Sequence, residues 1–210
     1  MTPTKILCIG RNYAAHAREM GAPAPAEPMV FLKPPSALVY TGGTVVLPRQ
    51  SSDVHHELEL VAVIGAGGKD IPEEQALAHV AGYALGLDLT ARDLQAAAKA
   101  AGAPWTVAKG FDTFAPLGPV APAGAVGDPQ ALEISLTING ELRQYGRTAD
   151  MLFPVDRLVA YLSTVFTLEE GDLVYTGTPE GVGPVRAGDV LEATGTRLLP
   201  LTVGVASFSD

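Results

Sequence analysis

Two glutamates lead directly into the most apolar run of the chain, and this arrangement restricts the fold more than any other feature of the sequence. Residues 52–65 read SDVHHELELVAVIG, so Glu57 and Glu59 alternate with leucines. On an extended strand this alternation places both carboxylates on one face, with Cα atoms about 6.5–7 Å apart. Val61 and Val63 continue that face, so a fully solvated edge strand explains it poorly. Half-buried like charges repel and lose hydration, so each carboxylate needs a partner.

The composition indicates a globular protein that does not bind nucleic acid. The chain has 210 residues, of which 47% are hydrophobic, and this is enough for a substantial core. Its formal net charge is −9, and its 14 lysines and arginines form no run. Phosphate backbones require clustered basic side chains, so they are excluded as partners. A small anionic substrate would need local positive charge or a metal ion.

Cysteine usage and hydropathy predict a cytoplasmic protein. The single cysteine, Cys8, lies within the apolar ILCI, permits no internal disulfide and is interpreted as a buried packing residue. A reducing compartment is the default for such a chain. The N-terminal residues do not resemble a signal peptide, and no run of 18 apolar residues exists, so we expect no membrane partner.

Short apolar runs bounded by Gly and Pro predict most of the strands. They cover residues 5–9, 30–34, 44–48, 56–64, 82–89 and 105–109, and Gly-Asp turns at 171–172 and 188–189 introduce two more. The strongest local signal is Asn139-Gly140 between two alternating runs, which predicts a hairpin with a two-residue turn.

Helices are fewer, and the order of elements defines the fold class. The predicted helices cover residues 13–20, 72–79, 91–101 and 154–166, and Asp70 is expected to cap the second. Strands outnumber helices without strict alternation, so we expect an α+β fold, mainly β, with mixed or antiparallel sheets. No linker divides the chain, which predicts a single domain over residues 1–210.

A third carboxylate lies in another apolar segment. Asp88 is the one charge within residues 82–90, where it could alternatively cap the helix that follows. With Glu57 and Glu59 it forms an oxygen-ligand set for a hard cation, Mg²⁺ first, with Mn²⁺ or Ca²⁺ as alternatives. Zinc fits poorly because no cluster of Cys and His accompanies the acids. His55 shares the strand parity of the glutamates, so a histidine ligand stays open.

Five segments in this order resemble the fumarylacetoacetate hydrolase family in its short single-domain form. They are GRNYAAHAREMG, HHELELVAVIG, GYALGLDLTARDLQ, WTVAKGFDTFAPLGP and GDLVYTGTPEGVG, which together span nearly the whole chain. The resemblance implies a β-roll or barrel-like mixed sheet with a few short helices, and a homodimer. In that family a Glu-x-Glu strand and a later Asp bind a divalent metal, which implies Glu57, Glu59 and Asp88 as ligands here.

The resemblance implies substrate contacts for further residues. Lys109 would meet the substrate's oxygens beside the metal, Arg92 and Gln95 would grip its carboxylate, and Thr178 would also contact it. Residues 143–145 could add to the pocket. Without the resemblance, Lys109 and Arg92 would be interpreted as surface cations, although the apolar residues before Lys109 weaken that interpretation.

A catalytic pair is expected near the N-terminus. His16 and Glu19 are three residues apart, close enough on a helix for the carboxylate to orient the imidazole. The family uses this pair to activate water, on a lid that here would follow the first strand within residues 1–21. A lone histidine near a solvated helix is usually inert, so this role depends on the resemblance. Two departures are Ala15, where the family commonly has Asp, and Leu87, where it often has Asn.

These implied roles describe a hydrolase that cleaves a C–C bond in a small 2,4-dioxo acid, an acylpyruvate. His16, aligned by Glu19, would deprotonate the attacking water, and cleavage would leave a pyruvate enolate near the metal and Lys109. Oxaloacetate decarboxylation and isomerisation of 2-hydroxyhepta-2,4-diene-1,7-dioate use the same electron sink, so fold and metal do not select among these reactions. A metal-dependent dicarboxylate-binding protein is the non-enzymatic alternative, which the His16–Glu19 pair disfavours.

Overall fold

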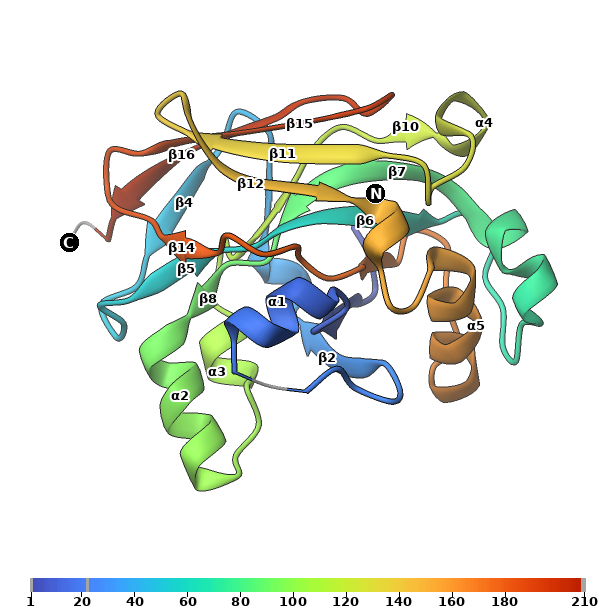
Figure 1. Cartoon of the computed structure of the whole chain (residues 1–210), viewed down its shortest axis with the longest axis horizontal. Helices are drawn as coiled ribbons and strands as arrows, with labels where there is room; N and C mark the ends of the chain where they lie inside the picture. Colours follow the sequence, from blue (N-terminus) through green and yellow to red (C-terminus); the bar gives the residue numbers. More distant parts are fainter. Residues whose placement is uncertain (1, 22, 209–210) are drawn as a thin grey trace.

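The largest β-sheet is mixed and carries the two glutamates. The computed structural model describes residues 2–21 and 23–208 (Figure 1). The strands of this sheet are β1 (Ile6–Gly10), β2 (Met29–Lys33), β3 (Leu38–Tyr40), β6 (Leu58–Ile64), β7 (Val80–Leu87), β9 (Ala115–Leu117), β10 (Ala121–Pro122) and β13 (Leu173–Tyr175). Their order is β2-β1-β13-β6-β7-β9-β3, with β10 paired to β7. The β1–β13 and β3–β9 pairs are parallel, so the predicted mixed sheet is confirmed.

A second sheet is built around the predicted hairpin. It comprises β4 (Thr44–Leu47), β11 (Glu133–Ile138), β12 (Glu141–Arg147), β15 (Val190–Gly195) and β16 (Leu201–Ser207) in the order β12-β11-β15-β16-β4. Asn139 and Gly140 join β11 to β12 with φ angles of 53° and 80°. Two positive φ angles define the turn type that matches strand twist, so the hairpin prediction is confirmed.

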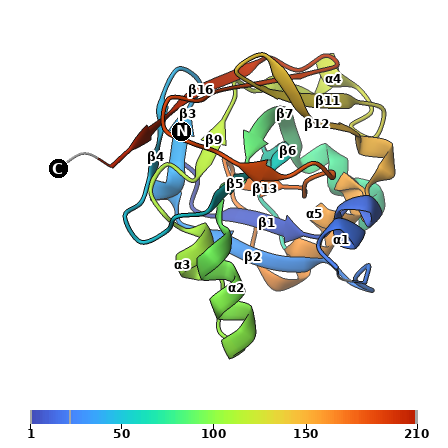
Figure 2. The same cartoon turned by 60° about the vertical axis from the view of Figure 1, so that its left-hand side comes forward.

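The two larger sheets curl toward one another (Figures 1 and 2). Apolar side chains from both sheets form one buried cluster. Leu85 and Leu87 of β7 pack with Leu136, Leu191 and Val203 of the second sheet. A small third sheet joins β5 (Val54–His56), β8 (Thr90–Ala91) and β14 (Gly183–Pro184). The result is the expected α+β fold, mainly β, in a curled half-barrel form.

Short helices surround the sheets. The α-helices are α1 (Ala14–Glu19), α2 (Arg92–Ala101), α3 (Thr106–Lys109), α4 (Ala123–Val126) and α5 (Val155–Val165), and the 3-10 helices are η1 (Pro35–Ala37), η2 (Glu73–His79) and η3 (Thr148–Asp150). Helix α5 buries Leu158 and Leu162 at the spacing that its sequence predicts. Within the described part of the chain, no helix combines the length and apolarity that a membrane span requires.

Three local predictions were wrong, each because tertiary contacts override local preference. The helix predicted over residues 72–79 is present as the 3-10 helix η2, Glu73–His79, but Asp70 does not cap it. Asp70 has a φ of 52°, and its N–H donates to the Ser163 carbonyl of α5. Residues 106–109 form α3 instead of an extended segment, since Lys109 N–H donates to the Trp105 carbonyl at 3.0 Å. The strand predicted over 56–64 divides at Glu57 into β5 and β6, which belong to different sheets.

Candidate active site

The division of the strand at Glu57 brings the third carboxylate to the first two. The Glu57 carbonyl accepts the N–H of Asp88 at 2.8 Å, just beyond the end of β7. Glu57, Glu59 and Asp88 are only 5%, 1% and 1% exposed. One ligand oxygen from each lies within 4.8 Å of the others. The structure therefore assembles the three carboxylates that the sequence singled out, and Asp88 is not the cap of α2, whose N-cap is Ala91.

Buried cations neutralise two of the three carboxylates. Lys109 Nζ donates to Glu57 Oε2 at 2.9 Å and to Asp88 Oδ2 at 2.5 Å. Arg92 Nη2 lies 2.5 Å from Glu57 Oε1. Burial alone would raise the pKa of Glu57, but Lys109 and Arg92 lower it well below its usual range. Burial alone would lower the pKa of the Lys109 ammonium. The negative charges of Asp88 and Glu57 outweigh that effect, so the pKa is raised.

Glu59 lacks such compensation. Within residues 2–21 and 23–208, its carboxylate pairs with no cation and accepts one hydrogen bond, from the Gly177 N–H at 2.8 Å. Burial, followed by the negative charges of Asp88 and Glu57, raises its pKa well above the ordinary value. A divalent cation would supply the missing positive charge, and carboxylate oxygens are the donors that hard cations prefer. The donor set fits such an ion, and the three carboxylates form a divalent-metal site.

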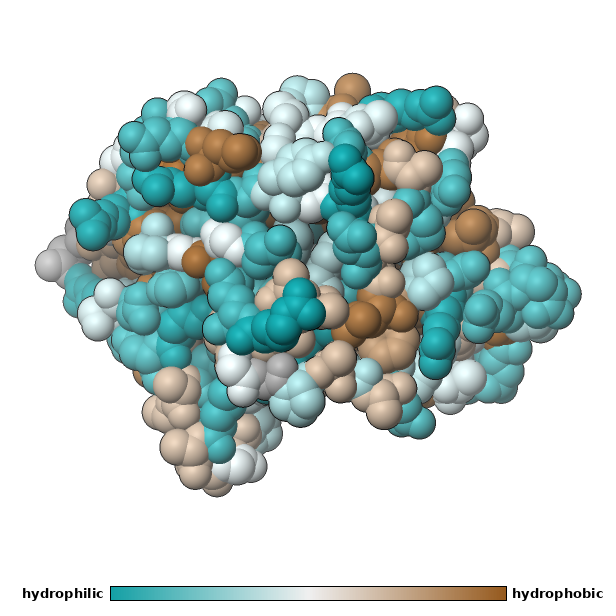
Figure 3. Space-filling view, in the orientation of Figure 1, coloured by the Kyte–Doolittle hydropathy of each residue, from teal (hydrophilic) through white to brown (hydrophobic). Residues whose placement is uncertain are grey.

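Helix α1 covers this site and carries the expected pair. His16 Nδ1 lies 3.1 Å from Glu19 Oε2, and Glu19 Oε1 accepts the Gly181 N–H at 3.1 Å. His16 is 5% exposed although α1 has only six residues. Figure 3 shows the face on which α1 lies as mostly hydrophilic, with small separate apolar patches. The helix thus has a solvated outer side and an inner side that holds the imidazole against the site.

One small cavity brings most of the predicted residues together. Its volume is about 30 Å³, room for roughly one or two water molecules. The residues lining it are Ile9, Gly10, Arg11, His16, Met20, Phe31, Glu57, Glu59, Arg92, Gln95, Lys99, Trp105, Lys109 and Thr178. Two further predicted residues do not line the cavity but contact residues that do. Asp88 accepts a hydrogen bond from Lys109, and Glu19 is hydrogen-bonded to His16. Inside the cavity wall, Arg92 Nη1 donates to Gln95 Oε1 at 3.0 Å.

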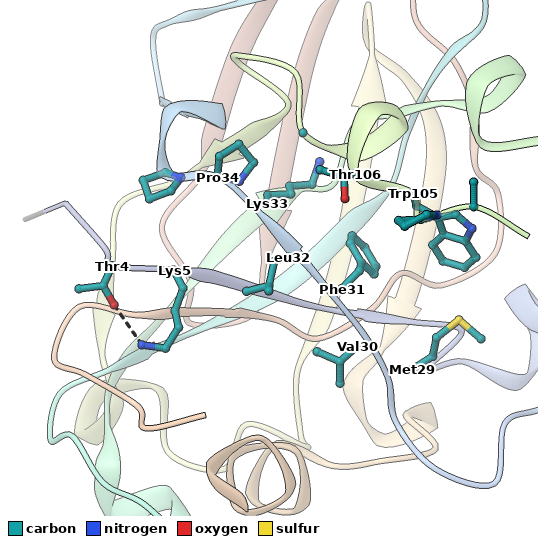
Figure 4. Close-up of a pocket in the computed structure, with 14 residues that line it drawn as sticks. Thr4, Lys5, Met29, Val30, Phe31, Leu32, Lys33, Pro34, Trp105 and Thr106 are labelled. Carbon is teal, nitrogen blue, oxygen red and sulfur yellow. Dashed lines mark hydrogen bonds between the residues drawn. The ribbon is translucent and has the colours of Figure 1, made fainter. Parts of the chain in front are cut away.

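A larger pocket lies elsewhere. A groove of about 740 Å³ runs along the outer side of β2 and the segment after α2 (Figure 4). Phe31 and Trp105 border both the groove and the small cavity. No carboxylate lines the groove among the described residues, so pocket size alone would not have identified the metal site.

Gln144 connects the second sheet to the site. Its Oε1 accepts the Leu58 N–H at 2.9 Å, and its Nε2 donates to Thr178 Oγ1 at 2.8 Å and to the Pro179 carbonyl at 3.0 Å. It thereby fixes Thr178 relative to the metal-binding strand. The neighbouring Tyr145 is 45% exposed because alternate residues of a strand face opposite sides. Of residues 143–145, the middle one is thus buried beside the site.

Sequence reasoning missed two buried polar residues. The strand prediction over residues 30–34 assigns no role to Lys33, which is 1% exposed and is the single charge in MVFLKP. Asn12 is fully buried and donates to the Phe153 and Thr176 carbonyls at 2.9 and 2.8 Å, which fixes the chain just before α1. A lone charge in an apolar strand was an available signal for Lys33, whereas no local signal distinguishes Asn12.

Comparison with known proteins defines the class. Residues 5–206 match the family model "Fumarylacetoacetate (FAA) hydrolase C-terminal". The oxaloacetate tautomerase FAHD1 of Arabidopsis thaliana is 53% identical over 93% of this chain and 87% of its own length. The oxaloacetate decarboxylase of Dictyostelium discoideum is 47% identical over 94% and 91%.

A solved structure gives the same result. The crystal structure of fumarylpyruvate hydrolase from Pseudomonas aeruginosa in complex with Mn²⁺ and pyruvate matches with a TM-score of 0.92 at 48% identity. The match covers 97% of this chain and 90% of that one. The chain belongs to the fumarylacetoacetate hydrolase family, and the resemblance stated from its motifs is confirmed. It is an enzyme of this family with a divalent-metal site.

Proposed function

We infer that this enzyme acts on small 2-oxo acids and that its main reaction is the keto–enol tautomerisation of oxaloacetate. The observation that carries this inference is the His16–Glu19 pair, which closes the same cavity that Lys109 and the carboxylates border. Proton transfer next to a carbonyl needs a base and a stabiliser of the developing oxygen charge within one small site. The Arabidopsis thaliana relative, 53% identical, is named an oxaloacetate tautomerase, which favours oxaloacetate as the substrate.

The side chains of this protein would supply binding, orientation and proton transfer. Arg92 and Gln95, already hydrogen-bonded to one another, would hold the 1-carboxylate. His16 would remove a proton from C3 of the keto form and return it in the reverse direction, while Glu19 keeps the imidazole oriented. Lys109 would stabilise the charge that develops on the 2-oxygen. When bound, a divalent cation supplies Lewis-acid polarisation of the 2-oxo group.

Hydrolysis of an acylpyruvate such as fumarylpyruvate is the second candidate, and it was the leading hypothesis from the sequence. The same pair favours it, because an imidazole that can remove a C3 proton could instead deprotonate a water molecule. The similar Pseudomonas aeruginosa protein is named for this reaction. Oxaloacetate decarboxylation, for which the Dictyostelium relative is named, needs stabilisation of the enolate but no base.

Parallel assays rank these reactions. With Mg²⁺ present, we would measure tautomerisation of enol-oxaloacetate, pyruvate formation from oxaloacetate, and loss of ultraviolet absorbance from fumarylpyruvate and acetylpyruvate. Tautomerisation should have the highest kcat/KM and should stop with chelator. His16→Gln should slow it by about 10²–10⁴-fold, the usual contribution of general acid–base catalysis. Arg18→Gln, an exposed change on the same helix, is the matched control. A higher kcat/KM for fumarylpyruvate would reverse the assignment in favour of the hydrolase.

The homodimer that the resemblance implies stays a prediction. Light scattering on the purified protein at micromolar concentration tests it, and a monomer would contradict it.

A further inference from the structure

Two cations in the small cavity have no role in the reaction described above. Arg11 follows β1 directly, and Lys99 lies in the last turn of α2, four residues after Gln95 and therefore on the same helix face. In the part of the chain that the structure describes, neither side chain lies within ion-pair distance of a carboxylate. Lys99 Nζ instead lies 5.1 Å from the centre of the Trp105 ring.

The charge around the cavity is unusual for this protein. The chain has 23 acidic and 14 basic residues, yet four cations and only two carboxylates line the cavity. Arg92 and Lys109 form ion pairs with Glu57. Arg11 and Lys99 are the two cations of the cavity lining that form no ion pair among the described residues. Burial, and then the positive charges of Arg11, Arg92 and Lys109, lower the pKa of Lys99. Its surroundings therefore favour the arrival of an anion.

The backbone at Arg11 is held in an uncommon conformation. Its φ is 59°, a left-handed conformation that non-glycine residues adopt rarely. Such conformations persist where the surrounding structure imposes them, and they concentrate at ligand sites. The next residue, Asn12, is anchored by its buried hydrogen bonds, so the position of Arg11 is fixed although its side chain is half-buried.

We propose that Arg11 and Lys99 form a subsite for the second carboxylate of a dicarboxylic 2-oxo acid and select such substrates over monocarboxylic ones. The proposal rests on the proposed function, in which Arg92, Gln95 and Lys109 take the 2-oxo acid end. A guanidinium and an ammonium that line one cavity can both bind the oxygens of a carboxylate through charge-assisted hydrogen bonds. Both cations line the same cavity as Arg92, Gln95 and Lys109, so one molecule can contact both groups.

A substrate pair that differs only in the distal charge tests the subsite. Oxaloacetate and its 4-methyl ester share the reacting 2-oxo group, and both can tautomerise. We expect wild type to prefer the diacid by about 10–100-fold in kcat/KM, equivalent to one or two charge-assisted hydrogen bonds. Arg11→Met and Lys99→Met should each lower kcat/KM for the diacid about tenfold and leave the ester within twofold. Arg18→Met, an exposed arginine, should change neither.

A binding experiment separates this proposal from the proposed function. 3,3-Difluoro-oxaloacetate has no C3 proton, so calorimetric titration of it and its 4-methyl ester into Mg²⁺-loaded protein needs no turnover. Weaker binding of the diacid to both variants, with the ester unchanged, supports the subsite even if wild type fails to tautomerise oxaloacetate. Equal losses for diacid and ester, or no preference in wild type, overturn it even if tautomerisation is observed. Circular dichroism and the melting temperature establish that both variants fold.

Discussion

Lys33 Nζ lies 2.7 Å from Asp88 Oδ1, and both side chains are almost fully buried. The same ammonium donates to the carbonyl oxygens of Leu89, Lys109 and Phe114 at 2.9, 2.7 and 2.7 Å. Burial lowers the pKa of Lys33, and Asp88 opposes that shift. One side chain of β2 therefore holds a metal ligand and the end of α3 that carries Lys109.

Replacing Lys33 should be strongly destabilising. Lys33→Met keeps most of the length of the side chain but removes the cation beside Asp88 Oδ1 and the donor to three buried carbonyls. Removing one member of a buried ion pair costs about 3–5 kcal/mol, so urea denaturation should show a loss of that size in the free energy of unfolding. Lys69→Met is the matched control, because the exposed Lys69 also donates to a carbonyl, that of Thr164. Its loss should stay within about 0.5 kcal/mol. Similar losses for both variants would contradict a structural role for Lys33.

Metal binding should release a proton from Glu59. In the metal-free protein, burial and the neighbouring carboxylates raise the pKa of Glu59. The proton must leave before a cation binds, so Mg²⁺ affinity should rise with pH from the ordinary carboxyl pKa to the raised one. Calorimetry in buffers of different ionisation enthalpy measures the released proton directly. If the heat of Mg²⁺ binding does not depend on the buffer at pH values between the two pKa values, Glu59 is not protonated in the metal-free protein.

The raised pKa of Glu59 also predicts how the stability of the metal-free protein varies with pH. A raised folded-state pKa contributes stability that is fully present below the unfolded pKa of Glu59 and is lost as pH rises toward the folded value. The metal-free wild type should therefore lose stability as pH rises from acidic toward neutral, and Mg²⁺ should restore it. Glu59→Gln removes the titration, so its unfolding free energy should vary less with pH and should not respond to Mg²⁺. Chemical denaturation at several pH values measures both effects.

The carboxylate site was predictable because its chemistry is local. Alternating acids before an apolar run, and the one acid in a second apolar segment, indicate buried oxygen ligands whatever the fold. The division of the strand at Glu57 was not predictable, since it depends on the Asp88 N–H and on Gln144, which are distant in sequence. The prediction of an extended segment at 105–109 was wrong for the same reason, because the Lys109 carbonyl at the end of α3 accepts a hydrogen bond from the distant Lys33.

Gln144 should act as a positioning residue. Gln144→Leu preserves most of its volume but removes the hydrogen bonds to Thr178 and the Leu58 N–H. Buried groups left without partners cost about 1–3 kcal/mol each, so the free energy of unfolding should fall by at least that amount. Because Thr178 loses its anchor, KM for oxaloacetate should rise more than kcat falls. Tyr145→Leu, one residue away and exposed, should change neither parameter. An unchanged KM in Gln144→Leu, with the expected loss of stability, would limit Gln144 to a structural role.

Gly177 should be required for both its conformation and the space around it. Its φ is 98°, and an added Cβ would lie 2.6 Å from Asn12 Cβ and 3.1 Å from the Ile9 carbonyl oxygen. Gly188 has a similar φ of 94° but no atom within 4 Å of the added Cβ. Gly188→Ala therefore measures backbone strain alone, about 1–2 kcal/mol.

Gly177→Ala adds a steric clash of about 1–3 kcal/mol to that strain, so its total loss in the free energy of unfolding should be larger by this amount. The backbone shift that relieves the clash would displace the N–H that donates to Glu59, and Mg²⁺ affinity should fall in Gly177→Ala but not in Gly188→Ala. Urea denaturation and calorimetric titration of both variants measure the two effects. Equal losses of stability with unchanged Mg²⁺ affinity would mean that the 176–178 segment can adjust without moving the metal ligand.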